Sequence, residues 1–159
     1  MDNLNQKISS LVKLCNEKSF DQALIEFKSL ITENFNDPII YNLGGVINAS
    51  LKNFEVAIDC FSKALKINPN YAEANNNMGA LLKTIGRTRD SIAYFEKAIK
   101  IKPDFTNAYN NLGASYNIMG KWDLAIQNYD KCLKINPNEK DSFNNLINLL
   151  TFHDPQEKD

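Results

Sequence analysis

The side chains that most often carry out catalysis are scarce in this sequence of 159 residues. His153 is the single histidine and lies in a polar tail, so a catalytic dyad or a histidine-based metal site would depend on one exposed imidazole. Cys15, Cys60 and Cys132 are widely spaced and form no CxxC pair, which favours small apolar fillers over a disulfide or a zinc site. The sequence also has no glycine-rich phosphate loop and no nucleophile elbow. We therefore expect no catalytic residue, no metal site and no cofactor.

Asparagine is the polar residue whose spacing suggests binding. Adjacent asparagines recur at intervals of 34 residues in segments that otherwise have helical spacing. Asparagine is a mediocre helix former because its side chain competes for backbone hydrogen bonds, so a doubled asparagine inside a helix needs a reason. An amide offers two donors and an acceptor, so it can bond both the N–H and the C=O of an extended peptide. The candidate binding residues are Asn42, Asn76, Asn77, Asn110, Asn111, Asn117, Asn144 and Asn145.

An internal repeat supplies the elements that position these asparagines. Residues 72–105 and 106–139 align without a gap at a period of 34 residues, and 38–71 and 4–37 continue the series toward the N-terminus. A period of this length is typical of a stack of equal supersecondary units. Residues 140–152 look like the first helix of a further unit, and 153–159 form a polar tail. We expect residues 1–152 to form a single domain.

Each repeat has the pattern of two helices joined by a tight turn. In residues 106–139, Tyr109, Leu112 and Tyr116 have the spacing of one apolar helix face. Gly120 suits the turn, because glycine readily adopts the positive φ that ends a helix. Small residues in one helix and aromatic residues in the other recur at fixed places, which predicts closely crossing helices. The recurring residues are Gly45, Gly79 and Gly113 in the first helices, and Phe61, Phe95 and Tyr129 in the second.

The pattern resembles the tetratricopeptide repeat, whose 34-residue motif has an aromatic residue, Leu-Gly, Tyr, Ala, Phe, Ala and Pro at fixed places. The resemblance covers nearly the whole chain and departs at its ends, where Leu11 and Ile147 replace the glycine. It implies an all-α fold, a right-handed superhelical solenoid of antiparallel helix hairpins with about four repeats plus a terminal helix. It also implies a concave groove, lined by the first helices, that binds peptide segments of partners. The matching residues of one repeat are Tyr109, Leu112, Gly113, Tyr116, Ala125, Tyr129, Cys132 and Pro137.

The resemblance places the asparagines in that groove, because at about 100° per residue they point away from the apolar face of their helix. They form two rows, which resemble the asparagine ladder in the repeat domain of O-linked N-acetylglucosamine transferases. We expect Asn76 and Asn110 to face solvent, and Asn77 and Asn111 to bond each other between repeats. A structural or compositional origin stays open, since asparagine is common along the whole chain. One row is Asn42, Asn76, Asn110 and Asn144, and the other is Asn77, Asn111 and Asn145.

Charge and hydropathy limit the partners. The net charge is -1 and the expected groove positions are mostly neutral, with Glu73 and Lys83 the main exceptions, so nucleic acid is a poor ligand. Chaperone-binding members of the family clamp a C-terminal carboxylate with several basic residues, which are missing here. The N-terminus does not resemble a signal peptide, and no apolar run is long enough for a membrane span. We expect a cytoplasmic protein that binds a protein or peptide partner, with no nucleic acid and no membrane.

Two functions remain open at this point. The chain is either a non-catalytic scaffold that holds an extended peptide, or the N-terminal recognition or oligomerisation module of a larger enzyme, such as a glycosyltransferase, methyltransferase, sulfotransferase or oxygenase. An open apolar face on the terminal helix 140–152 favours the second function, or self-association through that helix. The residues of this face are Phe143, Leu146, Leu149, Leu150 and Phe152.

Overall fold

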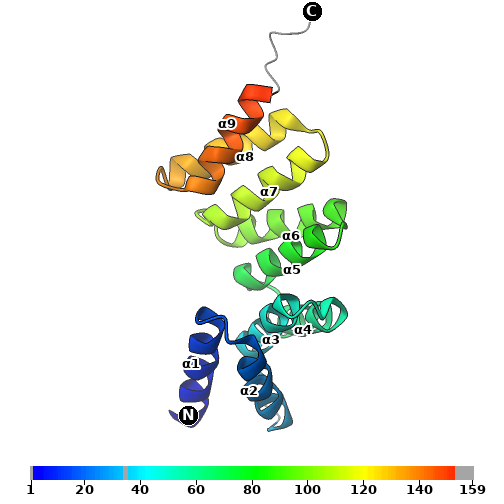
Figure 1. The fold of residues 1–159 in the computed structure, drawn as a ribbon, viewed down its shortest axis with the longest axis vertical. Helices are drawn as coiled ribbons and strands as arrows, with labels where there is room; N and C mark the ends of the chain where they lie inside the picture. Colours follow the sequence, from blue (N-terminus) through cyan, green and yellow to red (C-terminus); the bar gives the residue numbers. More distant parts are fainter. Residues whose placement is uncertain (1, 34–35, 153–159) are drawn as a thin grey trace, which may run out of the picture. The chain divides into compact units, whose positions relative to one another are not determined.

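The secondary structure of this chain is helical throughout the residues that the computed structural model describes, 2–33 and 36–152 (Figure 1). The expected polar tail 153–159, with His153, lies outside the described residues. The expected all-α fold class is confirmed. In chain order the helices are α1 (Asp2–Asn16), α2 (Phe20–Thr32), α3 (Pro38–Ser50), α4 (Phe54–Ile67), α5 (Ala72–Thr84), α6 (Thr88–Ile101), α7 (Thr106–Ile118), α8 (Trp122–Ile135) and α9 (Lys140–Phe152).

The chain divides into two compact units, Met1–Leu81 and Leu82–Asp159. In the first unit α1 packs against α2 and α3, and α3 packs against α2 and α4. In the second unit α7 packs against α6 and α8, and α9 lies against α8 and α7 (Figure 1). From α1 to α4 and from α6 to α9, each helix is thus a neighbour in space of the next one in the chain, as antiparallel hairpins require.

The tight turns inside the hairpins share one backbone geometry. Between α7 and α8, the Gly120 N–H donates to the Asn117 carbonyl at 3.0 Å and the Lys121 N–H to the Tyr116 carbonyl at 2.9 Å. These two bonds around a residue with positive φ make a Schellman motif, which satisfies the last carbonyls of the helix. The same pair of bonds recurs at the three earlier turns. The positive-φ residues are Lys18 (φ 57°), Lys52 (φ 62°), Gly86 (φ 83°) and Gly120 (φ 69°).

The link between α8 and α9 is set by proline. Asn136, at the end of α8, has φ -132° and ψ 94°, the extended conformation that a following proline favours. Its side-chain oxygen accepts a hydrogen bond from the Asn138 N–H at 3.2 Å, which tightens the turn. As a result α8 ends at Ile135, two residues before Pro137, and α9 begins at Lys140.

The helices of a hairpin cross at glycine. A Cβ on Gly113 would lie 2.7 Å from Cε1 of Tyr129, and a Cβ on Gly45 would lie 2.4 Å from Cε1 of Phe61. Both distances are too short for real carbon atoms, so only glycine fits beside each ring. Tyr129 and Phe61 are each 1% exposed. The predicted pairing of a small residue with an aromatic ring is confirmed at these two crossings.

Candidate functional site

In the second unit, two of the candidate asparagines meet between the first helices of successive hairpins. The Nδ2 of Asn145 on α9 donates to the Oδ1 of Asn110 on α7 at 3.2 Å. The hydroxyl of Ser142, one turn earlier on α9, donates to the same oxygen at 3.0 Å. The side-chain oxygen of Asn110 therefore accepts two hydrogen bonds within the unit, and these bonds hold α9 against α7.

A similar amide pair joins α3 and α5 in the first unit. The Nδ2 of Asn77 donates to the Oδ1 of Asn42 at 3.0 Å, and the Nδ2 of Asn42 donates to the Tyr71 hydroxyl at 3.5 Å. Asn42 is only 6% exposed. Since both polar groups of its amide are used inside the unit, Asn42 has a structural role and little capacity to bind a ligand.

The Asn110–Asn145 pair keeps one donor and one acceptor for a ligand. Within the described part of the chain, the Nδ2 of Asn110 has no acceptor and the Oδ1 of Asn145 has no donor. Both residues are half-buried. A free donor next to a free acceptor on two bonded amides matches the C=O and N–H that an extended backbone presents.

The remaining candidates differ in their surroundings. Asn117 and Asn144 are exposed, and their side-chain amides make no hydrogen bond with any described side chain or backbone group. Asn76 is 7% exposed, so the expectation that it faces solvent is wrong. The pairing expected between Asn77 and Asn111 stays a prediction; within the first unit, the Nδ2 of Asn77 donates to Asn42. The bonded amides are 35 residues apart rather than 34, so the contacts run diagonally from one expected row to the other.

Lys83, in the last turn of α5, lies beside Asn111 of α7. Its Nζ donates to the Oδ1 of Asn111 at 2.9 Å and is 6.0 Å from the centre of the Phe95 ring. The lysine is half-buried, and this burial lowers its pKa, since desolvation disfavours the charged form. No carboxylate of the described residues forms an ion pair with it.

The sequence analysis missed Ser142 and Tyr71, the hydroxyl partners of the two amide pairs. Ser142 is fully buried, and its place in the repeat is held by Ile40, Ala74 and Ala108 in the three preceding first helices. A hydroxyl at a place that holds an apolar residue in those helices is the signal that marks it. Tyr71 stands in the link before α5, outside any helical pattern, and carried no comparable signal.

Reactive groups are sparse in the described structure. Cys60 and Cys132 are 4% and 0% exposed, which confirms that these two cysteines fill apolar space, and burial raises the pKa of the Cys60 thiol to about 11. Among the residues described, no three His, Cys, Asp or Glu side chains come together in a way that could hold a metal ion. None of the described helices has both the length and the apolar character needed to cross a bilayer.

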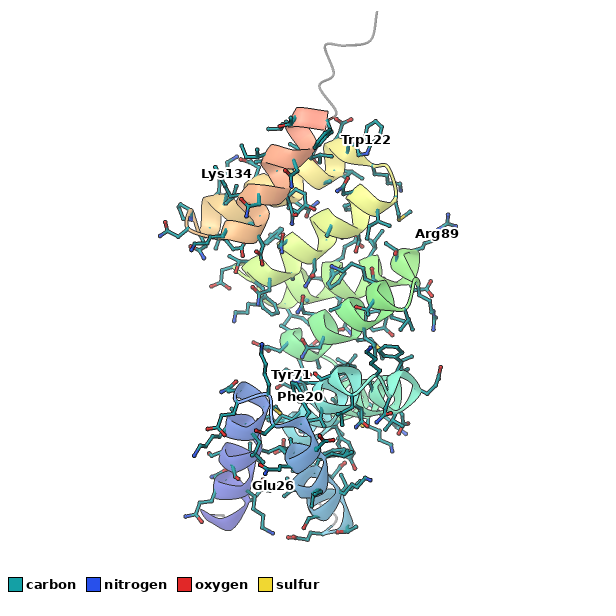
Figure 2. All side chains as sticks on the ribbon, viewed as in Figure 1. Phe20, Glu26, Tyr71, Arg89, Trp122 and Lys134 are labelled. Atoms are coloured by element: carbon teal, nitrogen blue, oxygen red, sulfur yellow. The ribbon has the colours of Figure 1, made fainter. Side chains whose placement is uncertain are left out.

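The expected apolar face of α9 is divided in the structure. Leu149 is 3% exposed and lies in the core of its unit, and the half-buried Leu146 packs against the same core, so neither belongs to an open face. Phe143, Ile147, Leu150 and Phe152 are 54%, 47%, 45% and 78% exposed. These four residues, referred to below as the α9 patch, form the open apolar surface of this helix. Figure 2 shows the side chains of the second unit, with Arg89 and Trp122 at its surface.

Comparison with family models gives three matches along the chain. A tetratricopeptide repeat model matches residues 106–139, a second tetratricopeptide repeat model matches 72–105, and a TPR repeat model matches 45–86. Together the three matches span residues 45–139, which is more than half of the chain. No curated protein matches the chain by sequence.

Solved structures share the fold at low sequence identity. The segment of MamA from residue 41 to its end, from Desulfovibrio magneticus RS-1, is 23% identical with a TM-score of 0.81, over 97% of this chain and 87% of that segment. YrrB, described as a TPR protein with an unusual peptide-binding site, is 18% identical with a TM-score of 0.73, over 82% of this chain and 68% of YrrB. The first TPR of Spaghetti (RPAP3), bound to the HSP90 peptide SRMEEVD, is 19% identical with a TM-score of 0.70, over 72% of this chain and 91% of that one.

Proposed function

Because the chain belongs to the tetratricopeptide repeat family, we propose that it is a non-catalytic scaffold that binds an extended segment of a partner protein. Two proteins of the same fold, YrrB and the RPAP3 domain, are described with a peptide-binding site and with a bound peptide. Those descriptions support a peptide as the class of ligand.

The unpaired groups of Asn110 and Asn145 carry the proposal. The Nδ2 of Asn110 donates to a carbonyl of the bound segment, and the Oδ1 of Asn145 accepts from one of its N–H groups. The bond between the two amides fixes both side chains before the ligand arrives, so little rotamer freedom is lost on binding. Each backbone bond contributes about 0.5–1.5 kcal/mol, or roughly 2- to 10-fold in affinity.

The other candidate asparagines have lesser parts in this proposal. Asn117 and Asn144 are exposed amides that contact the ligand beside the central pair. Asn77 keeps one free carbonyl oxygen, which makes it a secondary acceptor in the first unit. Asn42 supports Asn77 through their hydrogen bond, and Asn111 holds the ammonium group of Lys83. Recognition of this kind depends on backbone groups, so it tolerates many ligand sequences.

The test separates the ligand-facing group of Asn110 from its structural group. Asn110→Asp keeps an oxygen that accepts from Ser142 and Asn145, but it replaces the free NH2 with an acceptor. Asn138→Asp is the matched control, because it makes the same change of charge on an exposed side-chain amide of the second unit that lies in the α8–α9 link, outside the candidate binding residues. Peptides are first selected on the wild-type chain from a random ten-residue library, and their affinities are then measured by fluorescence anisotropy.

We expect Asn110→Asp to weaken the selected peptides about 5- to 10-fold or more, because a donor is replaced by a repelling oxygen. Asn138→Asp should change the affinity less than 2-fold. Equal affinities of Asn110→Asp and wild type would refute the role of this amide. Circular dichroism of each variant checks that the helices remain intact.

Self-association is a second proposed function, favoured by the exposure of the α9 patch. Four large apolar side chains on one terminal helix are more than a monomer usually leaves open. Replacing Phe143 with Glu places a charge in the patch. The test is sedimentation velocity over a range of concentrations: a concentration-dependent mass in wild type that is lost in Phe143→Glu supports self-association, and a constant monomer mass in wild type refutes it.

A cytoplasmic location and an attachment to a larger enzyme stay predictions. The limits of the single domain and of its repeats also stay predictions. The expectation that neither nucleic acid nor a membrane is a partner also stays a prediction.

A further inference from the structure

Lys83 is a charged residue that the repeat pattern does not require. The same place in the other repeats holds Cys15, Ala49 and Asn117. The fold is therefore built at this place with an apolar or a neutral side chain in every other repeat. A lysine here needs an explanation other than packing.

The surroundings of Lys83 leave its charge without a counter-ion. Lys83 is half-buried, yet the hydrogen bond of its ammonium group goes to a neutral amide oxygen of Asn111, and no described carboxylate forms an ion pair with it. Partial burial of an unpaired charge is unfavourable. An ammonium group has three donors, and the bond to Asn111 uses one of them.

The position of Lys83 relates this charge to the Asn110–Asn145 pair. Asn111, its hydrogen-bond partner, directly follows Asn110 on α7. The bond holds the ammonium group at α7 within the second unit. A peptide that pairs its backbone with Asn110 and Asn145 therefore passes near a partly desolvated cation.

We propose that Lys83 selects ligands with a carboxylate at one defined place beside the backbone segment held by Asn110 and Asn145. The inference rests on the proposed function and adds a class of ligand to it: an extended peptide with one acidic group. The carboxylate comes from an Asp or Glu side chain or from the C-terminus of the peptide, since both present the same chemistry to the ammonium group. A single lysine differs from the multi-residue carboxylate clamp that the sequence analysis excluded, so we expect one acidic position and no wider acidic motif.

The experiment scans one selected peptide for acidic preference. Every position is replaced in turn by Glu and by Gln, and each peptide is made with a free and with an amidated C-terminus. Affinities are measured for wild type, for Lys83→Asn and for Lys100→Asn. Asparagine is the residue of the next repeat at the Lys83 place, so this substitution fits the fold. Lys100 is an exposed lysine of α6, and its replacement is the matched change of charge.

In wild type we expect one position where Glu binds about 5- to 10-fold tighter than Gln, or a similar advantage of the free over the amidated C-terminus. The advantage should disappear in Lys83→Asn, persist in Lys100→Asn, and shrink as salt is raised. Which arm shows the advantage identifies the source of the carboxylate.

Three results would overturn the inference, and they separate it from the proposed function. An equal affinity of Glu and Gln peptides at every position, with equal affinity of free and amidated ends, refutes the inference alone. An advantage that persists in Lys83→Asn refutes the assignment to this lysine. Failure of the wild-type chain to bind any selected peptide refutes the proposed function and the inference with it.

Discussion

The four Schellman turns predict that replacing Lys52 with glycine stabilises the chain. Lys52 has φ 62° and makes the same two backbone bonds as Gly120, which has φ 69°. A side chain in this left-handed region costs about 1–2 kcal/mol through the contact between Cβ and the carbonyl oxygen. Glycine removes that cost, but its freer unfolded chain offsets about 0.5–1 kcal/mol of the gain. The net expectation for Lys52→Gly is about 0.5–1 kcal/mol of added stability.

The assay is urea unfolding followed by circular dichroism, with two matched controls. Gly120→Lys makes the reverse change at an equivalent turn, so it should lower stability by a similar amount. Lys66→Gly removes a lysine from the last turn of α4, where φ is helical, and should cost about 0.5–1 kcal/mol. A Lys52→Gly variant that loses as much stability as Lys66→Gly would refute the strain argument.

Three other changes test the packing of the two units. Gly113→Ala should lower stability by about 1–3 kcal/mol in urea unfolding, because its Cβ would lie 2.7 Å from the Tyr129 ring, and an unchanged midpoint would contradict the close crossing. Asn75 is 0% exposed, and its Nδ2 donates to the Tyr71 carbonyl at 2.9 Å, so Asn75→Asp, which replaces this donor with a buried charged oxygen, should lower stability by at least about 1–3 kcal/mol; an unchanged stability would contradict the burial of this donor. Burial raises the pKa of Tyr129 from 10.0 to about 12, so the unfolded chain loses its proton first and stability falls as pH rises through that interval. Tyr129→Phe should therefore unfold at a higher pH than wild type in an alkaline titration, and an unchanged midpoint would contradict the assignment.

The hairpins could be predicted from the sequence because each depends on residues close together in the chain. The spacing of Tyr109, Leu112 and Tyr116 sets one helix face, and Gly120 and Pro137 end the two helices of that hairpin. The crossing of Gly113 with Tyr129 follows from their places in the repeat, since a small residue facing a large ring leaves one arrangement with no overlap.

The arrangement of the amides could not be predicted in the same way. Whether Asn110 bonds residue 144 or residue 145 depends on the offset of one hairpin against the next, a small shift that the period alone does not contain. The burial of Asn76 also depends on tertiary packing, which overrides the orientation expected from its helix. Likewise the positive φ of Lys52 opposes the preference of its own residue type, because the turn around it requires that conformation.

The most direct test of the central claim replaces single backbone amides of a selected peptide with esters. An ester keeps every side chain but removes one N–H and weakens one carbonyl acceptor. We predict that an ester at one or two adjacent positions weakens binding about 2- to 10-fold, and that Asn145→Ala removes the difference between ester and amide at the N–H position. Esters that bind as well as the parent peptide at every position would contradict recognition of the backbone by Asn110 and Asn145.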